Sequence, residues 1–128
     1  MIIKIPFKTP SANKLYGKTF RHNSVYLRPE AKKLKQEIHD IVIHELAHNY
    51  DLGKHNIFRV VIEIHEDWYY KNGNVKKMDL ANREKFLIDS VFEAIGIDDK
   101  NIFEYTMKKI QDKEEYANIT IECLEKQE

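Results

Sequence analysis

The sequence of 128 residues has one cysteine, no long apolar run and no net charge. Cys123 has no second thiol for an internal disulfide or a zinc cluster, so it is most simply a small apolar residue in a late strand. The sequence has no run of about 18 apolar residues, the length that a membrane-spanning helix needs. Its first six residues are too short for a signal peptide. These absences predict a cytoplasmic protein with no membrane contact, and the length predicts a single domain over residues 1–128.

The zero net charge hides an uneven distribution along the chain. Residues 1–36 hold nine basic residues and one acid, so residues 37–128 hold twelve basic and twenty acidic residues. We call residues 1–36 the basic head. Such asymmetry is typical of a protein that binds phosphates with one surface and uses the carboxylates of another to hold metal ions or to interact with water. A basic loop and helix face exposed to water would have the same composition.

Periodicity predicts six regular elements in the order β-α-β-α-β-β. The expected strands are residues 2–7, 56–65, 102–110 and 116–125, and the expected helices are residues 29–49 and 80–95. Residues 11–28 are predicted to be a loop without a clear period, and residues 66–78 a charged loop with a turn at Asn72-Gly73. A hairpin across residues 111–113 would join the last two strands. The pattern predicts an α/β fold in which both helices pack on a mixed sheet.

The second predicted helix is amphipathic. Asp79 would cap its start and Gly96 would close it. Asn82, Lys85 and Asp89 fall together on a polar face. The expected buried face is a broad apolar arc of Leu87, Ile88, Val91, Phe92, Ala94 and Ile95.

Carboxylates at both ends of this helix, with a lysine between them, are groups that phosphodiester hydrolysis requires. Mg²⁺ and Mn²⁺ prefer oxygen ligands, a bound metal supplies hydroxide near neutral pH, and a lysine offsets the charge that builds on the phosphorane. Sixteen helical residues span about 24 Å, so the two ends share a site only if loops fold back or a second subunit contributes. Structural roles fit as well: Lys85 and Asp89 could form an ion pair, and Asp98-Asp99 a turn.

The acidic residues belong to a longer pattern. Asp79, Asn82, Lys85, Asp89, Asp98, Asp99 and either Lys108 or Lys109 follow one another in the order D-x-x-N-x-x-K, internal Asp, G-x-D-D and late Lys. Residues 10–16 have the form P-S-x-N-x-x-Y, and residues 26–35 look like a short strand leading into a helix. From about Ile5 to the final strand, this arrangement resembles the RusA family of Holliday junction resolvases.

The resemblance implies a RusA-like, homodimeric endonuclease that acts on four-way DNA junctions in recombination and repair. Each protomer would cut one strand, because paired nicks need two equivalent sites and twofold symmetry provides them. The implied cofactor is Mg²⁺, for which Mn²⁺ can substitute. Junction preference would come from the shape of the branched DNA and its phosphate positions.

The resemblance also implies roles for particular residues. Asp79 and Asp99 would bind the metal, and Asp98 would support them as a catalytic residue. Lys85 would stabilise the transition state, Asn82 would orient the first turn of the helix, and Asp89 would support the site. The expected DNA contacts lie in the basic head, at Lys14, Tyr16, Lys18 and Arg21.

One position departs from the family pattern. The family has D-x-D where this chain has Asp79-Leu80-Ala81, so an acid that is taken to be a metal ligand is replaced by Ala81. Its loss could weaken metal binding or abolish cutting. A protein that binds branched DNA without cutting it is therefore the second hypothesis.

A different motif lies on the first predicted helix. His44, Glu45 and His48 fit H-E-x-x-H, in which two histidines one turn apart hold zinc and the glutamate activates water. His55 could be a third ligand, but the extended motif would need Gly at position 51 and His at position 54, where Asp51 and Lys54 stand. A zinc metallopeptidase is the third hypothesis.

Overall fold

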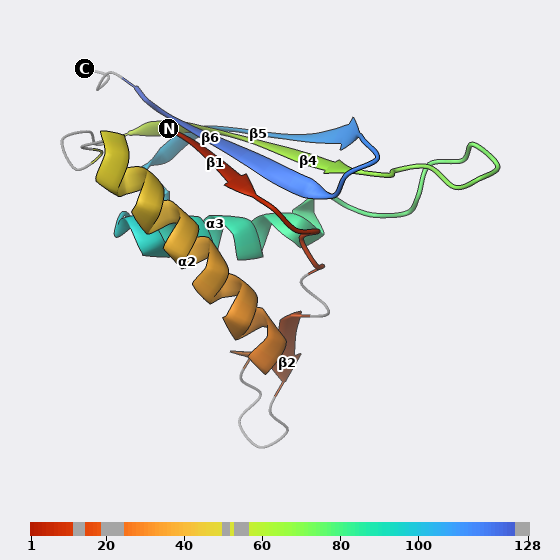
Figure 1. The fold of residues 1–128 in the computed structure, drawn as a ribbon, viewed down its shortest axis with the longest axis horizontal. Coiled ribbons are helices and arrows are strands. Elements are labelled where there is room, and N and C mark those ends of the chain that lie inside the picture. Colours follow the sequence, from red (N-terminus) through yellow and green to blue (C-terminus); the bar gives the residue numbers. More distant parts are fainter. Residues whose placement is uncertain (12–14, 19–24, 50–51, 53–56, 125–128) are drawn as a thin grey trace.

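The computed structural model describes residues 1–11, 15–18, 25–49, 52 and 57–124. Its elements are β1 (Ile2–Ile5), β2 (Tyr16–Lys18), β3 (Val25–Leu27), α2 (Pro29–Asn49), β4 (Phe58–Glu66), α3 (Ala81–Ile95), the 3-10 helix η2 (Asp99–Asn101), β5 (Ile102–Gln111) and β6 (Tyr116–Cys123). One sheet has the strand order β1-β6-β4-β5, and β2 pairs with β3 apart from it. Figure 1 shows α2 and α3 on the same face of the larger sheet, which confirms the predicted α/β fold.

The core lies between the four-stranded sheet and the two helices. Side chains of β4 alternate between buried and half-buried positions, because successive residues of a strand point to opposite faces. The apolar side chains of the buried face pack in one cluster with side chains of β1, β6 and both helices, including Ile3, Ile119, Ile38, Phe86, Leu87 and Val91. Five of the six residues predicted for the buried face of α3 are buried, and Ile95 is half-buried. Within the described residues, no helix is long and apolar enough to cross a membrane.

The connection between the last two strands differs from the prediction. β5 pairs with β4 in parallel, whereas β6 pairs with β4 and β1 in antiparallel fashion. The two strands therefore lie on opposite sides of β4, and the predicted β5–β6 hairpin is wrong. Residues 112–115 pass the end of β4, where the Asp112 backbone N–H donates to the Glu66 carbonyl at 3.1 Å. Alternating patterns identify strands but do not say which strands are neighbours.

The predicted loop at residues 11–28 contains regular structure. β2 and β3 pair antiparallel, with Gly17 opposite Tyr26. A Cβ atom at Gly17 would collide with the ring of Tyr26, so the glycine allows the aromatic ring to lie across the neighbouring strand. Three-residue strands are too short to show a period in the sequence, which explains why the prediction of an irregular loop was wrong here.

Residues 67–78, which we call the arm, leave the end of β4 and return to the start of α3. An antiparallel bridge joins Tyr69 and Val75, and the Gly73 N–H donates to the Tyr70 carbonyl at 2.9 Å. Gly73 has φ +87°, a conformation that glycine adopts without strain, so the predicted turn is confirmed. Figure 1 shows the arm projecting beyond the edge of the fold. Glu66, predicted to begin this loop, is instead the last residue of β4.

Candidate active site

The start of α3 differs from the predicted capped helix. Its N-cap residue is Leu80, in a helical conformation, and no side chain makes a capping hydrogen bond. The N–H groups of Asn82 and Arg83 donate instead to the carbonyls of Asp79 and Leu80. The predicted N-cap role of Asp79 is therefore wrong, because a backbone turn already occupies these donors. Asp79 is exposed and lines a pocket with Ser11, Lys77, Met78, Asn82 and Arg83.

A buried ion pair fixes this end of α3 to the sheet. Arg83 and Glu66 are 1% and 2% exposed, and Arg83 donates from Nη1 to Glu66 Oε1 at 2.9 Å and from Nη2 to Oε2 at 3.4 Å. Arg83 also donates to the carbonyl of Thr9, and Lys8 Nζ lies 3.7 Å from Glu66 Oε2. The pair thus joins β4, the start of α3 and the segment before Ser11, and it holds the pocket around Asp79 together.

Breaking this pair from one side is expected to be strongly destabilising. Glu66→Leu leaves the Arg83 guanidinium buried without its carboxylate, which costs about 3–5 kcal/mol. The double variant Glu66→Leu/Arg83→Met, which buries no charge at these two positions, should recover most of the loss. Urea unfolding of the wild type, Glu66→Leu, Arg83→Met and the double variant gives the coupling energy between the two residues. If Glu66→Leu lowered the free energy of unfolding by less than about 1 kcal/mol, the ion pair would not be important for stability.

Four predicted site residues lie near one another on and beside α3. Lys85 Nζ lies 5.0 Å from the centroid of the Tyr16 ring, so the lysine contacts β2 of the basic head. Burial raises the pKa of the Asp89 carboxyl, the charge of Lys85 opposes this shift, and the charge of Asp99 adds to it. Burial and the charge of Asp89 also raise the pKa of the Tyr16 hydroxyl. Tyr16, Lys85, Asp89 and Asp99 are thus close enough to interact electrostatically.

Asp98 and Asp99 follow the C-terminal end of α3. Gly96, with φ +82°, closes the helix, and its N–H donates to the Phe92 carbonyl at 2.9 Å. Asp98 Oδ1 accepts from the Lys100 N–H at 2.9 Å, and this hydrogen bond holds the pKa of the Asp98 carboxyl below its usual range. Asp98 therefore caps η2, while Asp99 belongs to it. Both line a pocket with Lys35, Asp89 and Glu93, among other residues.

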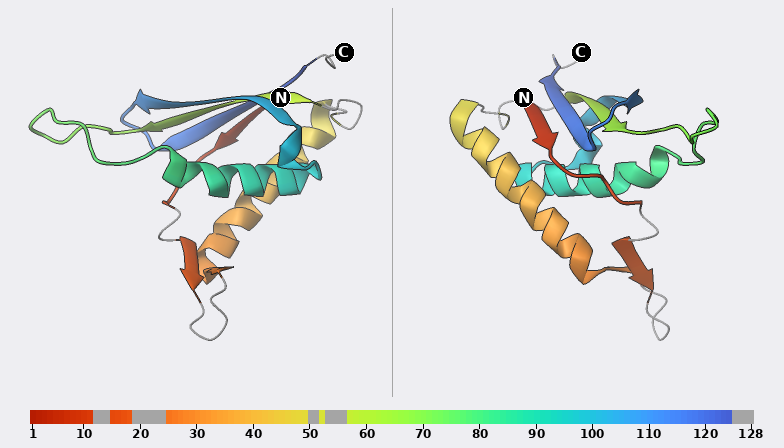
Figure 2. Two further views of the ribbon diagram at one scale, coloured as in Figure 1. Left: turned by 180° about the vertical axis from the view of Figure 1, so that it is seen from behind. Right: turned by 45° about the vertical axis from the view of Figure 1, so that its right-hand side comes forward.

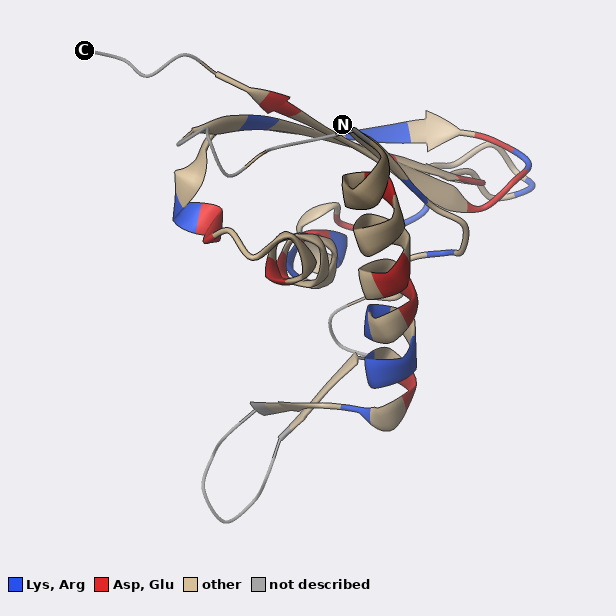
Figure 3. Cartoon of the chain, turned by 60° about the vertical axis from the view of Figure 1, so that its left-hand side comes forward, with Lys and Arg blue, Asp and Glu red and all other residues tan. Residues whose placement is uncertain are grey.

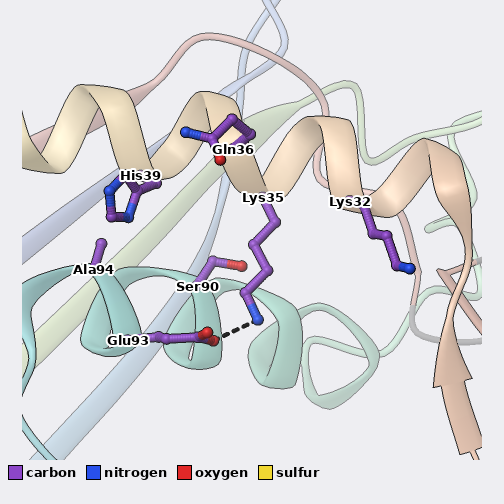
Figure 4. A pocket seen from close by; sticks show the side chains of 7 residues that line it. All are labelled: Lys32, Lys35, Gln36, His39, Ser90, Glu93 and Ala94. Carbon is purple, nitrogen blue, oxygen red and sulfur yellow. Dashed lines mark ion pairs between the residues drawn. The ribbon is translucent and has the colours of Figure 1, made fainter.

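The N-terminal half of α2 lies beside this acidic region. Figure 3 shows lysines along that half of α2 and acidic residues at η2. An ion pair between Lys35 and Glu93 joins α2 to α3, and Figure 4 shows it inside a pocket that Lys32, Gln36, His39, Ser90 and Ala94 also line. The contact aligns the basic side of α2 with the polar face of α3.

The predicted metal ligands are not brought together within one chain. Asp79 precedes α3 and Asp99 follows it, and the 15 helical residues between them span about 22 Å. They line different pockets. In the part of the chain that the structure describes, no three His, Cys, Asp or Glu side chains are grouped to hold a metal ion. Of the two routes to a shared site, loops that fold back and a second subunit, the described loops do not supply the first.

Part of the predicted DNA contact surface lies outside the described residues. Lys14 and Arg21 are outside them, and only the backbone of Lys18 is described. Tyr16 is half-buried against Lys85, and the exposed Arg28, Lys32 and Lys33 continue the basic head into α2. The described part of the basic head therefore adjoins the polar face of α3.

The H-E-x-x-H motif lies on α2, as predicted. His44 and His48 are exposed, with ring centroids 4.4 Å apart, and His48 Nδ1 lies 2.9 Å from the His44 carbonyl. His55 is outside the described residues. Among those that are described, these two histidines belong to no group of three metal-ligating side chains, so the described residues supply no third ligand of the kind that a catalytic zinc site needs.

Several residues with a structural part in the site gave no clear sequence signal. Arg83 stands between the predicted Asn82 and Lys85, and Glu66 was assigned to a loop. A charged residue at a position that continues the buried side of a strand or helix is the one available sign of such a pair. Glu66 is in register with Phe58, Val60, Ile62 and Ile64 on the buried face of β4, so strand periodicity extended by one residue would have found it.

A mixed α/β domain that presents a lysine and carboxylates on one helix beside a basic segment has the side chains of a phosphodiester-cleaving enzyme. The family model of the endodeoxyribonuclease RusA matches residues 6–122, and the chain therefore belongs to the RusA endodeoxyribonuclease family. The resemblance inferred from the motifs is confirmed. No significant match is found among curated proteins.

Membership defines the enzyme class. RusA proteins are Holliday junction resolvases, which hydrolyse phosphodiester bonds in branched DNA, and they generally depend on a divalent metal. The chain is accordingly an endodeoxyribonuclease of DNA recombination.

Proposed function

We propose that this protein is a Mg²⁺-dependent homodimer that resolves four-way junctions by paired nicks, and that Mn²⁺ can replace Mg²⁺. The observation that carries the proposal is that Lys85 of α3 lies beside Tyr16 of the basic head, while Asp89 of the same helix lines one pocket with Asp98 and Asp99. A DNA phosphate held by the basic head would lie next to carboxylates and a lysine, which are the groups that its hydrolysis requires.

The donor set suits a hard divalent cation. Mg²⁺ in phosphoryl-transfer sites is commonly held by one or two carboxylates, and water and substrate phosphates complete its shell. Asp89 and Asp99 are near enough for the charge of Asp99 to raise the pKa of the Asp89 carboxyl, and a cation beside them would relieve this repulsion. When bound, the ion would activate water and stabilise charge on the phosphate. Asp79 and Asp99 remain the proposed ligands, with Asp98 and Asp89 in support.

The other predicted residues have roles that follow from their positions. Lys85 would offset the charge that develops on the phosphate, because its ammonium lies on the exposed face of α3 beside Tyr16. Asn82, one turn before Lys85, would orient the DNA strand and the first turn of α3. Lys14, Lys18 and Arg21, together with Tyr16, would hold the DNA arms.

The dimer would complete the metal site. Since Asp79 and Asp99 lie at opposite ends of α3, a twofold arrangement of two antiparallel α3 helices would bring Asp79 of one protomer to Asp99 of the other. Such an isologous contact creates two equivalent sites. Two equivalent sites are also what paired nicks require.

A junction-cleavage assay tests the proposal directly. A labelled synthetic four-way junction and a linear duplex of the same sequence are incubated with the protein, with and without Mg²⁺ or Mn²⁺. We expect metal-dependent cutting of the junction and little cutting of the duplex. Tight binding without cutting at any metal concentration would favour a branched-DNA-binding protein. Casein cleavage with copurifying zinc would favour the peptidase.

The weakened-site hypothesis rests on Ala81. This alanine is exposed at the first position of α3, two residues after Asp79, and stands where the family has a second acid. We predict that Ala81→Asp shifts the Mg²⁺ titration of junction cutting severalfold to lower concentration, because it adds an oxygen ligand. Ala81→Asn, which adds no charge, is the control. A curve shifted to higher Mg²⁺ would mean that the added charge only repels Asp79.

A further inference from the structure

The arm is a basic segment within the acidic part of the chain. The arm contains Lys71, Lys76 and Lys77 and one acid, Asp67, at its base, although residues 37–128 as a whole carry an excess of acids. The arm also exposes apolar surface: Tyr69, Tyr70 and Val75 are 46%, 52% and 58% exposed. Lysines interleaved with exposed aromatic rings suit nucleic acid, because cations contact phosphates and rings stack on bases.

The arm is anchored firmly at its base. Trp68 is buried, and its Nε1 donates to the carbonyls of Ile64 and Ile110 at 3.2 and 3.1 Å. Its backbone N–H donates to Gln111 Oε1 at 2.8 Å, and the Lys76 N–H donates to the Trp68 carbonyl at 2.9 Å. The exposed rings are therefore carried on a fixed support, so stacking on DNA would order few additional residues.

The position of the arm relates it to the site. Its last residues, Lys77 and Met78, line the pocket of Asp79 together with Ser11. The tip projects away from the start of α3, beyond the end of β4, in both views of Figure 2. A DNA strand whose phosphate lies at Asp79 would thus continue along the arm.

We propose that the arm reads the branch point of the junction. Tyr69 and Tyr70 stack on bases that are exposed where the strands exchange, and Lys71, Lys76 and Lys77 hold the phosphates between that point and Asp79. Linear duplex keeps its bases stacked and offers only phosphates, so the tyrosines favour branched over linear DNA. This inference rests on the proposed function, since it concerns the same DNA substrate.

Binding by tyrosine variants tests the stacking. In an Asp79→Asn background, which prevents cutting, fluorescence anisotropy measures affinity for a four-way junction and for linear duplex. We expect Tyr69→Ala and Tyr70→Ala each to weaken junction binding by about 5-fold or more, as loss of one base–aromatic stack does. Duplex affinity should change less than twofold. The Tyr69→Phe/Tyr70→Phe protein keeps the rings and should bind the junction as the parent does.

The lysines are tested by the salt dependence of junction binding. Lys71→Gln should reduce the slope of log affinity against log salt by about one unit. Lys113→Gln, in the exposed connection between β5 and β6, is the matched control and should leave the slope unchanged. Equal slopes for both variants and the parent would overturn the phosphate contacts.

Failure of this inference is distinguishable from failure of the proposed function. If the wild type cuts junctions and the tyrosine variants bind them unchanged, the arm does not read the branch point. Equal losses on junction and duplex also overturn the branch specificity. If Tyr69→Ala/Tyr70→Ala converts a dimer to a monomer in sedimentation, the arm is a contact between protomers instead. If the wild type binds no junction, the proposed function fails, and the arm inference fails with it.

Discussion

Asp99→Asn is expected to lower the rate of junction cutting by more than about 100-fold, because loss of a metal ligand should exceed the 10- to 100-fold cost of losing an outer-shell partner. Junction affinity should stay within about twofold of the wild type, since the proposed phosphate contacts are lysines and arginines of the basic head and the arm and do not include Asp99. The substitution preserves shape, and the Asp99 carbonyl that accepts from the Ile102 N–H in η2 is retained. Single-turnover cleavage and anisotropy measure the two effects.

Asp40→Asn is the matched control for this variant. Asp40 is an exposed aspartate on α2 whose carboxylate accepts from Gln36 Nε2 at 2.9 Å, and it does not line the pocket of Asp79 or that of Asp99. It should cut as the wild type does. Cutting by Asp99→Asn at the wild-type rate, at low as well as saturating Mg²⁺, would exclude Asp99 from the site.

The parts of the fold that repeat a period were predictable from the sequence. Five of the six residues predicted for the apolar arc of α3 are buried, because residues that recur at a spacing of about 3.6 lie on one face of a helix. Phe86, which is also buried on α3, was not among the predicted residues. α2 was predicted with both of its bounds, 29 and 49, since Pro29 suits the first turn of a helix and apolar residues then recur at helical spacing. In both cases local sequence and tertiary packing require the same residues.

The features that depend on long-range contacts were not predictable in this way. The placement of β5 and β6 on opposite sides of β4 is decided by pairing between distant strands. The salt bridge between Glu66 and Arg83 could not be predicted from either segment alone. Each residue would be expected on the surface as a charged side chain unless its partner were known to lie beside it. The arm was predicted as a charged loop, and only the structure shows that a backbone bridge joins Tyr69 to Val75 and that the tyrosines of the arm are exposed.

The candidate site was predictable as a set of residues but not as an arrangement. The motif gave Asp79, Lys85, Asp89 and Asp99 in order, whereas the structure places Asp89 and Asp99 in one pocket and separates Asp79 from Asp99 by the length of α3. A helix of known length fixes that separation. The hydrophobic periodicity of one chain does not show which residues of two protomers contact each other. The sequence therefore left open how the site is completed.

Heterodimers of Asp79→Asn with Asp99→Asn are expected to recover nicking that neither homodimer has. If each site combines Asp79 of one protomer with Asp99 of the other, the heterodimer contains one site with both substitutions and one with neither. Coexpression with two different tags and purification through both isolates this species. Its single intact site should nick the junction at about half the wild-type rate, and the product should be a nicked junction, since resolution needs a second cut.

Two further results decide the interpretation of this experiment. A heterodimer of Asp79→Asn with the double variant Asp79→Asn/Asp99→Asn is the control, because every possible site in it lacks Asp79, and it should stay inactive. If Asp79 and Asp99 of the same chain formed each site, both sites of the mixed heterodimer would carry one substitution, and no nicking would return. That outcome would place both ligands in one chain, and the region before Asp79 would then have to close onto the end of α3 over a distance of about 22 Å.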